Sequence, residues 1–215
     1  MKVEEALTGG SATAEVVAAV RPSMKERQRQ LREDAILDAS IELLKTKGFN
    51  AMTLEDITEA IGISRPTLYQ HFKSKEDVVM HISLRCRRQS MEFLAAQDPS
   101  VSARNRLEQF CDWVLDMRFG SQALPFNDMM KVISAQDNED PVLVELETRF
   151  LAAFVGLVEE AQAEGGVRRD LSAFMVAQVL IGLVKNYTLD DQLASGATTI
   201  AEIKDTAMKM LLVPV

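Results

Sequence analysis

The sequence predicts an all-α fold, and three observations support this. Apolar residues recur at spacings of three and four along almost every segment, as they do on the buried face of a helix. No segment alternates apolar and polar residues as a half-buried strand does. Helix-ending residues separate the periodic segments. They are Gly48, Gly62, Pro99, Gly120, Pro125, Pro141, Gly165, Gly166 and Gly196.

We expect three parts along the chain. Residues 1–22 are expected to be a flexible tail, because they lack the basic start and long apolar run of a signal peptide. Residues 23–75 are expected to form a three-helix domain. Residues 76–215 are expected to form a larger helical domain, for which 215 residues leave enough sequence.

Charge and cysteine content narrow the class of protein. The net charge of −8 argues against a protein that coats nucleic acid non-specifically, yet residues 21–75 carry ten basic against eight acidic side chains. Cys86 and Cys111 lack metal-type spacing, which favours reduced thiols. The longest apolar run, 174–184, is too short for a membrane span of roughly 20 residues. We therefore expect a cytoplasmic protein that acts away from any membrane.

The first helix is expected over residues 25–47. Its apolar positions recur at i+4, and Gly48 ends it in the manner of a residue that follows a helix C-cap. The predicted buried stripe consists of Leu31, Ala35, Ala39 and Leu43, with Ile36 beside it.

Two short helices follow with explicit start and stop signals. Thr53 is placed as the N-cap of the second helix with Asp56 three residues later, a capping box with a shortened acid, and Gly62 ends the helix. Ser64 then caps a third helix. Two short helices joined by a tight glycine turn are the helix-turn-helix pattern.

The third helix, expected over residues 65–73, exposes a polar face. On a helical wheel Leu68 and Phe72 point inward as an i, i+4 pair. A major groove of DNA admits such a helix and presents base edges to its side chains. The opposite face carries Pro66, Gln70 and Lys73, with Tyr69 and Thr67 at its edges.

These side chains suit two kinds of DNA contact. Gln70 can pair with an adenine edge, Arg65 with a guanine, and Pro66 or the Thr67 methyl can touch a thymine methyl. Phosphates suit other side chains better, namely those of Tyr69, Thr53 and Lys75. Any one of these residues alone is better explained by a solvated helix face. The whole set, after a capped helix and glycine turn, favours DNA binding.

The run AILDASIELLKTKGFNAMTLEDITEAIGISRPTLYQHFKSKEDVV, residues 35–79, resembles the N-terminal domain of TetR-type transcriptional regulators. The resemblance extends from Lys25 to about Val79 and implies that Leu68 and Phe72 are structural. It also implies a helical C-terminal domain that binds a small molecule and dimerises. The DNA contacts it implies are Thr53, Arg65, Pro66, Thr67, Tyr69, Gln70, His71 and Lys75.

The C-terminal helices are candidates for a homodimer interface. A helix expected over 171–189 is apolar nearly all round, and with the last helix, 198–212, it can form a two-fold four-helix interface. A core helix of a monomer has the same composition. A dimer is favoured because two recognition helices contact both halves of a palindromic operator on double-stranded DNA.

Aromatic residues, methionines and one acid are candidates for a ligand cavity between helices. The same residue types also form ordinary core. Asp112, Asp116 and Arg118 can orient a polar or cationic ligand or simply be solvated. The candidate lining is Trp113, Asp116, Met117, Phe126, Met129, Met130, Phe150, Phe154 and Met175.

The sequence predicts a homodimeric repressor that a small-molecule effector releases from its operator. The long helix expected over 76–96 joins the two domains and is the expected lever. The alternative is a DNA-bound adapter whose C-terminal domain docks another protein. An enzyme, a metal site or a cofactor is not expected, because His81 and Cys86 are poorly spaced for ligation on one helix face and no catalytic set is evident.

Overall fold

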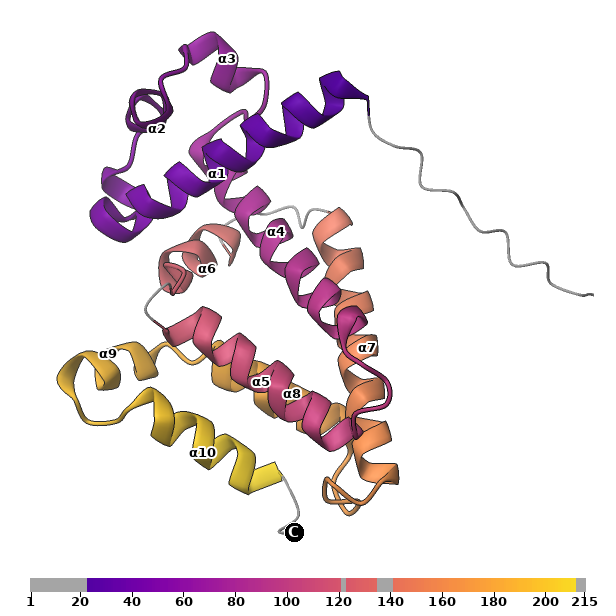
Figure 1. Cartoon of the computed structure of the whole chain (residues 1–215). Helices are drawn as coiled ribbons and strands as arrows, with labels where there is room; N and C mark the ends of the chain where they lie inside the picture. Colours follow the sequence, from indigo (N-terminus) through magenta and orange to yellow (C-terminus); the bar gives the residue numbers. More distant parts are fainter. Residues whose placement is uncertain (1–22, 121–122, 135–140, 212–215) are drawn as a thin grey trace, which may run out of the picture.

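The computed structural model describes residues 23–120, 123–134 and 141–211, and helices dominate them (Figure 1). The tail expected over 1–22 and the last predicted helical residue, 212, lie outside the described residues. No β-strand occurs in the described ranges, as the all-α prediction requires. The helices are α1 Met24–Ala51, α2 Leu54–Ile61, α3 Arg65–Tyr69, α4 Lys75–Ala96, α5 Ala103–Phe119, α6 Phe126–Ser134, α7 Pro141–Ala163, α8 Ala173–Val184, α9 Thr188–Ser195 and α10 Ile200–Leu211.

Helix α1 begins one residue before the predicted start at Lys25, at a side-chain cap that the sequence analysis did not name. The Ser23 side chain accepts from the Glu26 N–H in a capping box that begins α1. Gly48 is the predicted stop, and its φ of 73° interrupts α1 with a kink, after which a last turn continues to Ala51. That positive φ suits glycine, because a side chain is strained in the left-handed region.

The buried face of α1 differs from the predicted stripe. Leu31 is 70% exposed and Ala35 is also exposed. Alanines bury little area, so the larger branched residues decide which face turns inward. The buried residues of α1 are Ile36, Leu37, Ser40, Ile41 and Leu44.

One apolar cluster, here called the N-terminal core, holds α1, α2, α3 and the start of α4 together. It extends past the domain boundary expected at residue 75, through Val78, Val79 and Ile82 of α4. Two residues of α6, Met129 and Val132, also belong to it. The remaining members are Ile36, Leu37, Ile41, Leu44, Met52, Ile57, Leu68 and Phe72.

The second apolar cluster belongs to the C-terminal helices. Helix α4 packs on α7, α6 and α1, so it connects the two halves of the molecule (Figure 1). Helix α7 in turn packs against α5 and α8, and α10 covers α5. The aromatic centre of this cluster is formed by Phe110, Phe150 and Phe154, with ring centroids 5.1–5.9 Å apart.

The helix expected over 171–189 is two helices. Helix α8 ends at Val184, and α9 begins at Thr188. Asn186 lies at the break between them. Its side-chain oxygen accepts hydrogen bonds from the Thr188 N–H at 3.1 Å and from the Thr188 hydroxyl at 2.8 Å. None of the described helices has the length and apolar character needed to cross a membrane.

Candidate nucleic-acid interface and ligand cavity

Helix α3 is short and is anchored from behind. The Ser64 hydroxyl accepts from the Thr67 N–H at 3.3 Å and begins the helix. Pro66 lies in the first turn, where its missing N–H has no intrahelical partner to lose. Leu68 is fully buried and Phe72 is 1% exposed, so the opposite side of α3 is fixed facing outward.

The outward side of α3 carries four of the predicted DNA-contacting residues. Arg65, Pro66 and Gln70 are exposed, and Tyr69 is 55% exposed. The helix ends at Tyr69, so Lys73 does not share this face as the helical wheel predicted. Lys73 is an exposed residue of the link to α4, where its N–H donates to the Asp77 carboxylate at 2.7 Å.

His71 and Lys75 are engaged within the domain. The His71 side chain is 7% exposed, and its Nδ1 lies 3.1 Å from a carboxylate oxygen of Glu33 on α1. Lys75 Nζ donates to the carbonyl oxygens of Phe49 at 3.0 Å and Met52 at 3.4 Å. Both side chains join the recognition region to α1 and the turn that follows it.

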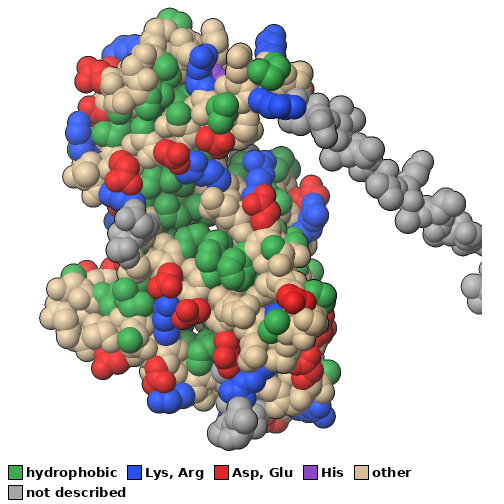
Figure 2. Space-filling view, viewed as in Figure 1, with side chains coloured by type: hydrophobic (Ala, Val, Ile, Leu, Met, Phe, Trp, Pro, Cys, Tyr) green, Lys and Arg blue, Asp and Glu red, His purple; other side chains and the backbone are tan. Residues whose placement is uncertain are grey.

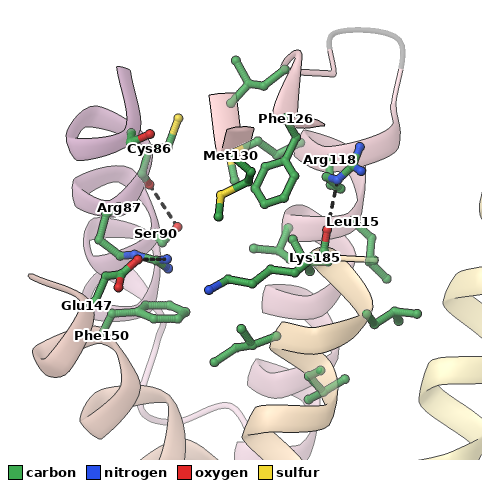
Figure 3. Close-up of a pocket in the computed structure, with 18 of the residues that line it drawn as sticks. Cys86, Arg87, Ser90, Leu115, Arg118, Phe126, Met130, Glu147, Phe150 and Lys185 are labelled. Atoms are coloured by element: carbon green, nitrogen blue, oxygen red, sulfur yellow. Dashed lines mark hydrogen bonds and ion pairs between the residues drawn. The ribbon is translucent and has the colours of Figure 1, made fainter. Parts of the chain in front are cut away.

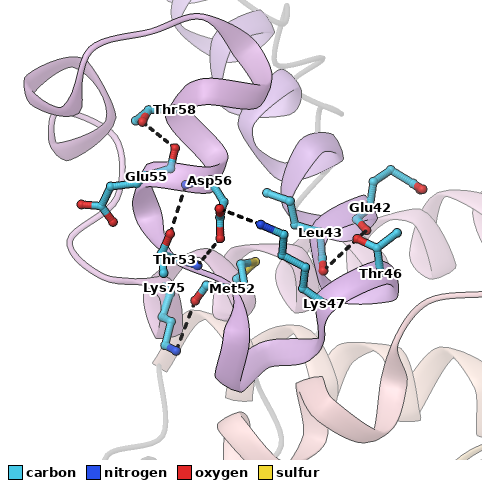
Figure 4. Close-up of polar contacts among 10 residues, drawn as sticks. All are labelled: Glu42, Leu43, Thr46, Lys47, Met52, Thr53, Glu55, Asp56, Thr58 and Lys75. Atoms are coloured by element: carbon cyan, nitrogen blue, oxygen red, sulfur yellow. Dashed lines mark hydrogen bonds and ion pairs between the residues drawn. The ribbon is translucent and has the colours of Figure 1, made fainter.

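The start of α2 is held by a network around Asp56 (Figure 4). The Thr53 hydroxyl accepts from the Asp56 N–H at 3.1 Å, and the Asp56 carboxylate accepts from the Thr53 N–H at 2.9 Å. Lys47 Nζ donates to the same carboxylate at 2.7 Å. The Lys47 contact first, and then the Thr53 bonds, lower the pKa of Asp56 to about 2. Helix α2 also pairs with α3 through Glu55 and Arg65.

A cavity of about 140 Å³ lies among α4, α5, α6, α7 and α8 (Figure 3). One water molecule needs about 10–15 Å³ on the same measure, so the cavity has room for a considerably larger molecule. Its wall is mostly apolar. Six of the predicted lining residues are present, namely Met117, Phe126, Met129, Met130, Phe150 and Phe154.

The other three predicted residues lie outside this cavity. Trp113 stacks on Phe93, with ring centroids 4.8 Å apart. Asp116 faces α10, where its carboxylate lies 2.9 Å from Lys204 Nζ. Met175 is 56% exposed on α8. All three were predicted from residue type, but each lies on a side of its helix that does not line the cavity.

Three charged residues of the cavity, Arg87, Glu147 and Lys185, were not among the candidates from the sequence, whereas Arg118 was. Arg87 of α4 lies over the Phe150 ring at 4.3 Å, and its Nη2 is 3.5 Å from the carboxylate of Glu147. Its buried Nε has no hydrogen-bond partner. Burial lowers the pKa of Arg87, although Glu147 opposes the shift. Lys185, which follows α8, also lines the cavity.

Arg118 is a structural clamp beside the cavity. It is 4% exposed, and its guanidinium donates to the carboxylate of Asp190 at 2.8 and 2.5 Å. It also donates to the Asn127 side chain at 3.3 Å and to the Val184 carbonyl at 3.0 Å. Burial acts to raise the pKa of Asp190, but hydrogen bonds from Arg118 and Asn127 outweigh it and lower the pKa. Arg118 therefore joins α5, α6, α8 and α9 and is not a solvated charge.

Helix α6 contacts both the cavity and the N-terminal core. Met129 belongs to both. The Asp128 carboxylate accepts from the Phe49 N–H at 3.1 Å, a bond between residues 79 positions apart in the chain. A Cβ on Gly48 would lie 3.3 Å from the same oxygen, so this turn is close-packed against α6.

The described residues contain no group of three or more His, Cys, Asp or Glu side chains placed to hold a metal ion. Cys86 borders the cavity, and burial raises the pKa of its thiol to about 11. Cys111 is buried more deeply, with its pKa raised to about 12. Neither thiol is activated as a nucleophile or ligand.

Comparisons with known proteins agree with the helix-turn-helix geometry. Residues 36–82 match the family described as bacterial regulatory proteins, tetR family. The regulator AlkX of Mycobacterium tuberculosis is 38% identical over 73 residues, which span only about a third of each protein, 34% of this chain and 35% of AlkX. The repressor BepR of Brucella suis biovar 1 is 28% identical over 162 residues, 72% of this chain and 77% of BepR.

A solved structure shares the whole fold. The TetR family protein CprB from S. coelicolor A3(2) superposes with a TM-score of 0.65 at 20% identity, covering 87% of this chain and 91% of CprB. The fold and the exposed α3 define a helix-turn-helix DNA-binding regulator. The family match assigns residues 36–82 to the tetR family of bacterial regulatory proteins, and the similarities to BepR and CprB extend over the C-terminal helices.

Proposed function

We propose that this protein is a homodimeric repressor of a palindromic operator, and that a small molecule in the cavity releases it from DNA. One observation carries the proposal. Helix α6 lines the cavity and also completes the N-terminal core through Met129 and Val132. A ligand that repositions α6 therefore acts on α4 and α1, which share the N-terminal core with α3.

The proposed DNA contacts follow from exposure. Arg65, Pro66, Tyr69 and Gln70 face outward on α3, where they can enter a major groove. We assign Thr53, Thr67 and Lys73 to phosphates or groove edges. His71 and Lys75 are proposed to act by holding α3 and α4 in place, because both are bonded within the domain.

Exposed apolar residues on the C-terminal helices support the proposed dimer. Phe174, Met175 and Val179 of α8 are about half exposed, at 49%, 56% and 51%, and Met210 of α10 is 62% exposed. Gly182 of α8 is open to solvent, with nothing within 4 Å of a Cβ placed on it. An apolar helix face with a small residue suits close packing against a second copy.

Release requires that the ligand prefer one conformation of α6 over another. Phe126 and Met130 of α6 line the cavity, so a ligand that displaces them shifts the helix. The shift reaches the turn after α1 through the bond between Asp128 and the Phe49 N–H. Helix α4, the lever expected from the sequence, packs on both α6 and α1 and moves with them.

Chromosomal footprinting tests the proposal. We expect a palindromic preferred site, and we expect a Tyr69→Ala, Gln70→Ala variant to lose binding to it. A Glu59→Ala variant, which removes an exposed α2 side chain, serves as the matched control and should still bind. Binding without any preferred site would contradict the proposal.

The alternative is a DNA-bound adapter that docks another protein, and it predicts a different interior for the C-terminal domain. It requires no ligand space and is best served by a filled core. The cavity of about 140 Å³ counts against it. An operator complex insensitive to every small molecule, yet dissolved by a protein partner, would favour the adapter.

A further inference from the structure

We propose that the effector is an apolar molecule with a single anionic group, a carboxylate, and that Lys185 and Arg87 bind this group. The inference rests on the ligand-released function proposed above and specifies the chemistry of its ligand. Two observations support it: the cavity wall has more positive than negative charge, and one of its buried hydrogen-bond donors has no acceptor.

Four charged side chains line the cavity, and three of them are cations. Arg118 is matched by Asp190, and Arg87 is matched by Glu147. Lys185 forms no ion pair with any residue that the structure describes. The lining therefore carries one positive charge in excess. Lys185 is an exposed residue at the cavity wall, so its ammonium is solvated and remains free to form a charge-assisted hydrogen bond with a ligand anion. The cavity therefore favours a monoanion.

The donors of Arg87 are only partly used. Its single contact with Glu147, at 3.5 Å, leaves the buried Nε–H without an acceptor. A buried donor without a partner costs stability, which a ligand oxygen would recover. Figure 3 shows the Lys185 side chain extending across the cavity toward the wall that holds Arg87 and Glu147. Two cationic donors thus face one region of the cavity.

A neutral or cationic head group fits this wall less well. A cation would need Glu147, which Arg87 already contacts, and would lie near Lys185. The other polar group on the same helix is satisfied, because the Ser90 hydroxyl donates to the Cys86 carbonyl at 3.0 Å. A carboxylate can accept two hydrogen bonds at once and matches guanidinium geometry.

The rest of the wall fits an apolar body. Phe110, Phe126, Met130 and Leu180 are among the apolar residues that line the cavity, and the Phe150 ring lies under the Arg87 guanidinium. Such surfaces bind hydrocarbon or aromatic groups without directional demands. The combination of a cationic wall and an apolar remainder describes an amphiphilic acid.

The test compares three probes with one hydrocarbon chain: decanoate, 1-decanol and decyltrimethylammonium. Binding to the full-length protein is measured by calorimetry and by the fluorescence of Trp113. Trp113 is the single tryptophan, and its ring centroid is 6.1 Å from that of Phe110, which lines the cavity. We expect decanoate to bind about tenfold or more tightly than decanol, since charged hydrogen bonds contribute about 1.5–3 kcal/mol. Decyltrimethylammonium should bind most weakly.

Variants of Lys185 attribute the preference to the proposed site. Lys185→Gln should weaken decanoate binding about tenfold, the loss of one charged hydrogen bond, and leave decanol binding unchanged. Lys185→Arg should restore decanoate binding. Lys204→Gln is the matched control, because Lys204 is a cation of α10 that pairs with Asp112 and Asp116 away from the cavity. It should bind all three probes as the unmodified protein does.

Three results would overturn the inference: no decanoate binding, equal binding of all three head groups, or a Lys185→Gln variant with unchanged decanoate affinity. Operator release is measured in parallel and separates this inference from the proposed function. Release by decanol at the same concentrations as decanoate would leave ligand release standing and remove the anion site. Charge-dependent decanoate binding without any change in operator affinity would support the anion site and contradict release from the operator by a ligand.

Discussion

The N-terminal core and the C-terminal cavity are both enclosed by helices, but they are packed differently. The N-terminal core is filled, with Ile36, Ile57, Leu68, Val79 and Ile82 fully buried. The C-terminal helices leave a cavity whose wall includes charged side chains. The buried Leu68 and Phe72 side chains fix the orientation of α3, whereas α6 borders free space on its cavity side. Under the proposed function, this difference separates the region that recognises DNA from the region that responds to a ligand.

Matched truncations of two phenylalanines should give the largest effect and test this difference. Phe72→Ala empties a packed site in the N-terminal core, where Phe72 is 1% exposed, and should cost about 3–5 kcal/mol of stability. Phe154→Ala removes a ring that already borders free space, so it loses fewer contacts and should cost less. Urea unfolding of both variants measures the costs. Equal costs would mean that the two regions do not differ in packing as described.

Asp190→Asn should have the next largest effect. It leaves the buried Arg118 guanidinium without its carboxylate and should cost about 2 kcal/mol, in the range of hydrogen bonds to charged groups. The loss should also loosen the helices around the cavity and raise their amide hydrogen exchange. Asp191→Asn, at an exposed neighbouring position, is the control. An Asp190 variant as stable as that control would show that the clamp contributes little.

Asp128→Ala should have a smaller effect on stability and a specific effect on coupling. Loss of the bond to the Phe49 N–H should cost about 1 kcal/mol. The ratio of operator affinities with and without ligand should move toward one, because the contact between α6 and the α1 turn is gone. Asp128→Asn retains an acceptor oxygen and should preserve most of the ratio. An unchanged ratio in the alanine variant would assign the coupling to α4 and to the packing of Met129 and Val132 in the N-terminal core.

The smallest expected effect is a pH-dependent one at Asp56. Its pKa is lowered to about 2 in the folded protein, below the ordinary value of 3.8. The carboxylate therefore contributes stability above about pH 4, and this is lost as the pH falls through about 2. The stability difference between the unmodified protein and Asp56→Ala should shrink as the pH is lowered from 5 to 2.5. Glu59→Ala controls for the loss of an exposed acid of α2, and a constant difference would contradict the assignment.

Local signals made the N-terminal helices predictable. The caps Thr53 and Ser64, and the glycine stops Gly48 and Gly62, act within a few residues of their own positions. The sequence failed where the answer depends on distant segments. The inward face of α1 is decided by what packs against it, and the wheel wrongly extended α3 to Lys73.

The sequence predicted only part of the cavity lining, because the lining also depends on how distant helices pack together. Aromatic residues and methionines such as Phe126 and Met130 indicated an adaptable apolar site, but they did not indicate which helix faces would converge. Nothing in the local sequence distinguishes Arg87 or Lys185 from a solvated helix charge. Their position beside the cavity appears only when α4, α7 and α8 are packed together.

The packing of Met129 and Val132 into the N-terminal core limits how this regulator can be engineered. A chimera that grafts residues 23–82 onto a foreign ligand-binding domain would leave an apolar hollow where α6 belongs. Such a graft would need the host helix to supply two side chains of similar volume, together with an acceptor for the Phe49 N–H. The DNA-binding segment is therefore not a portable module by itself, because it needs either α6 or a host helix that makes the same contacts.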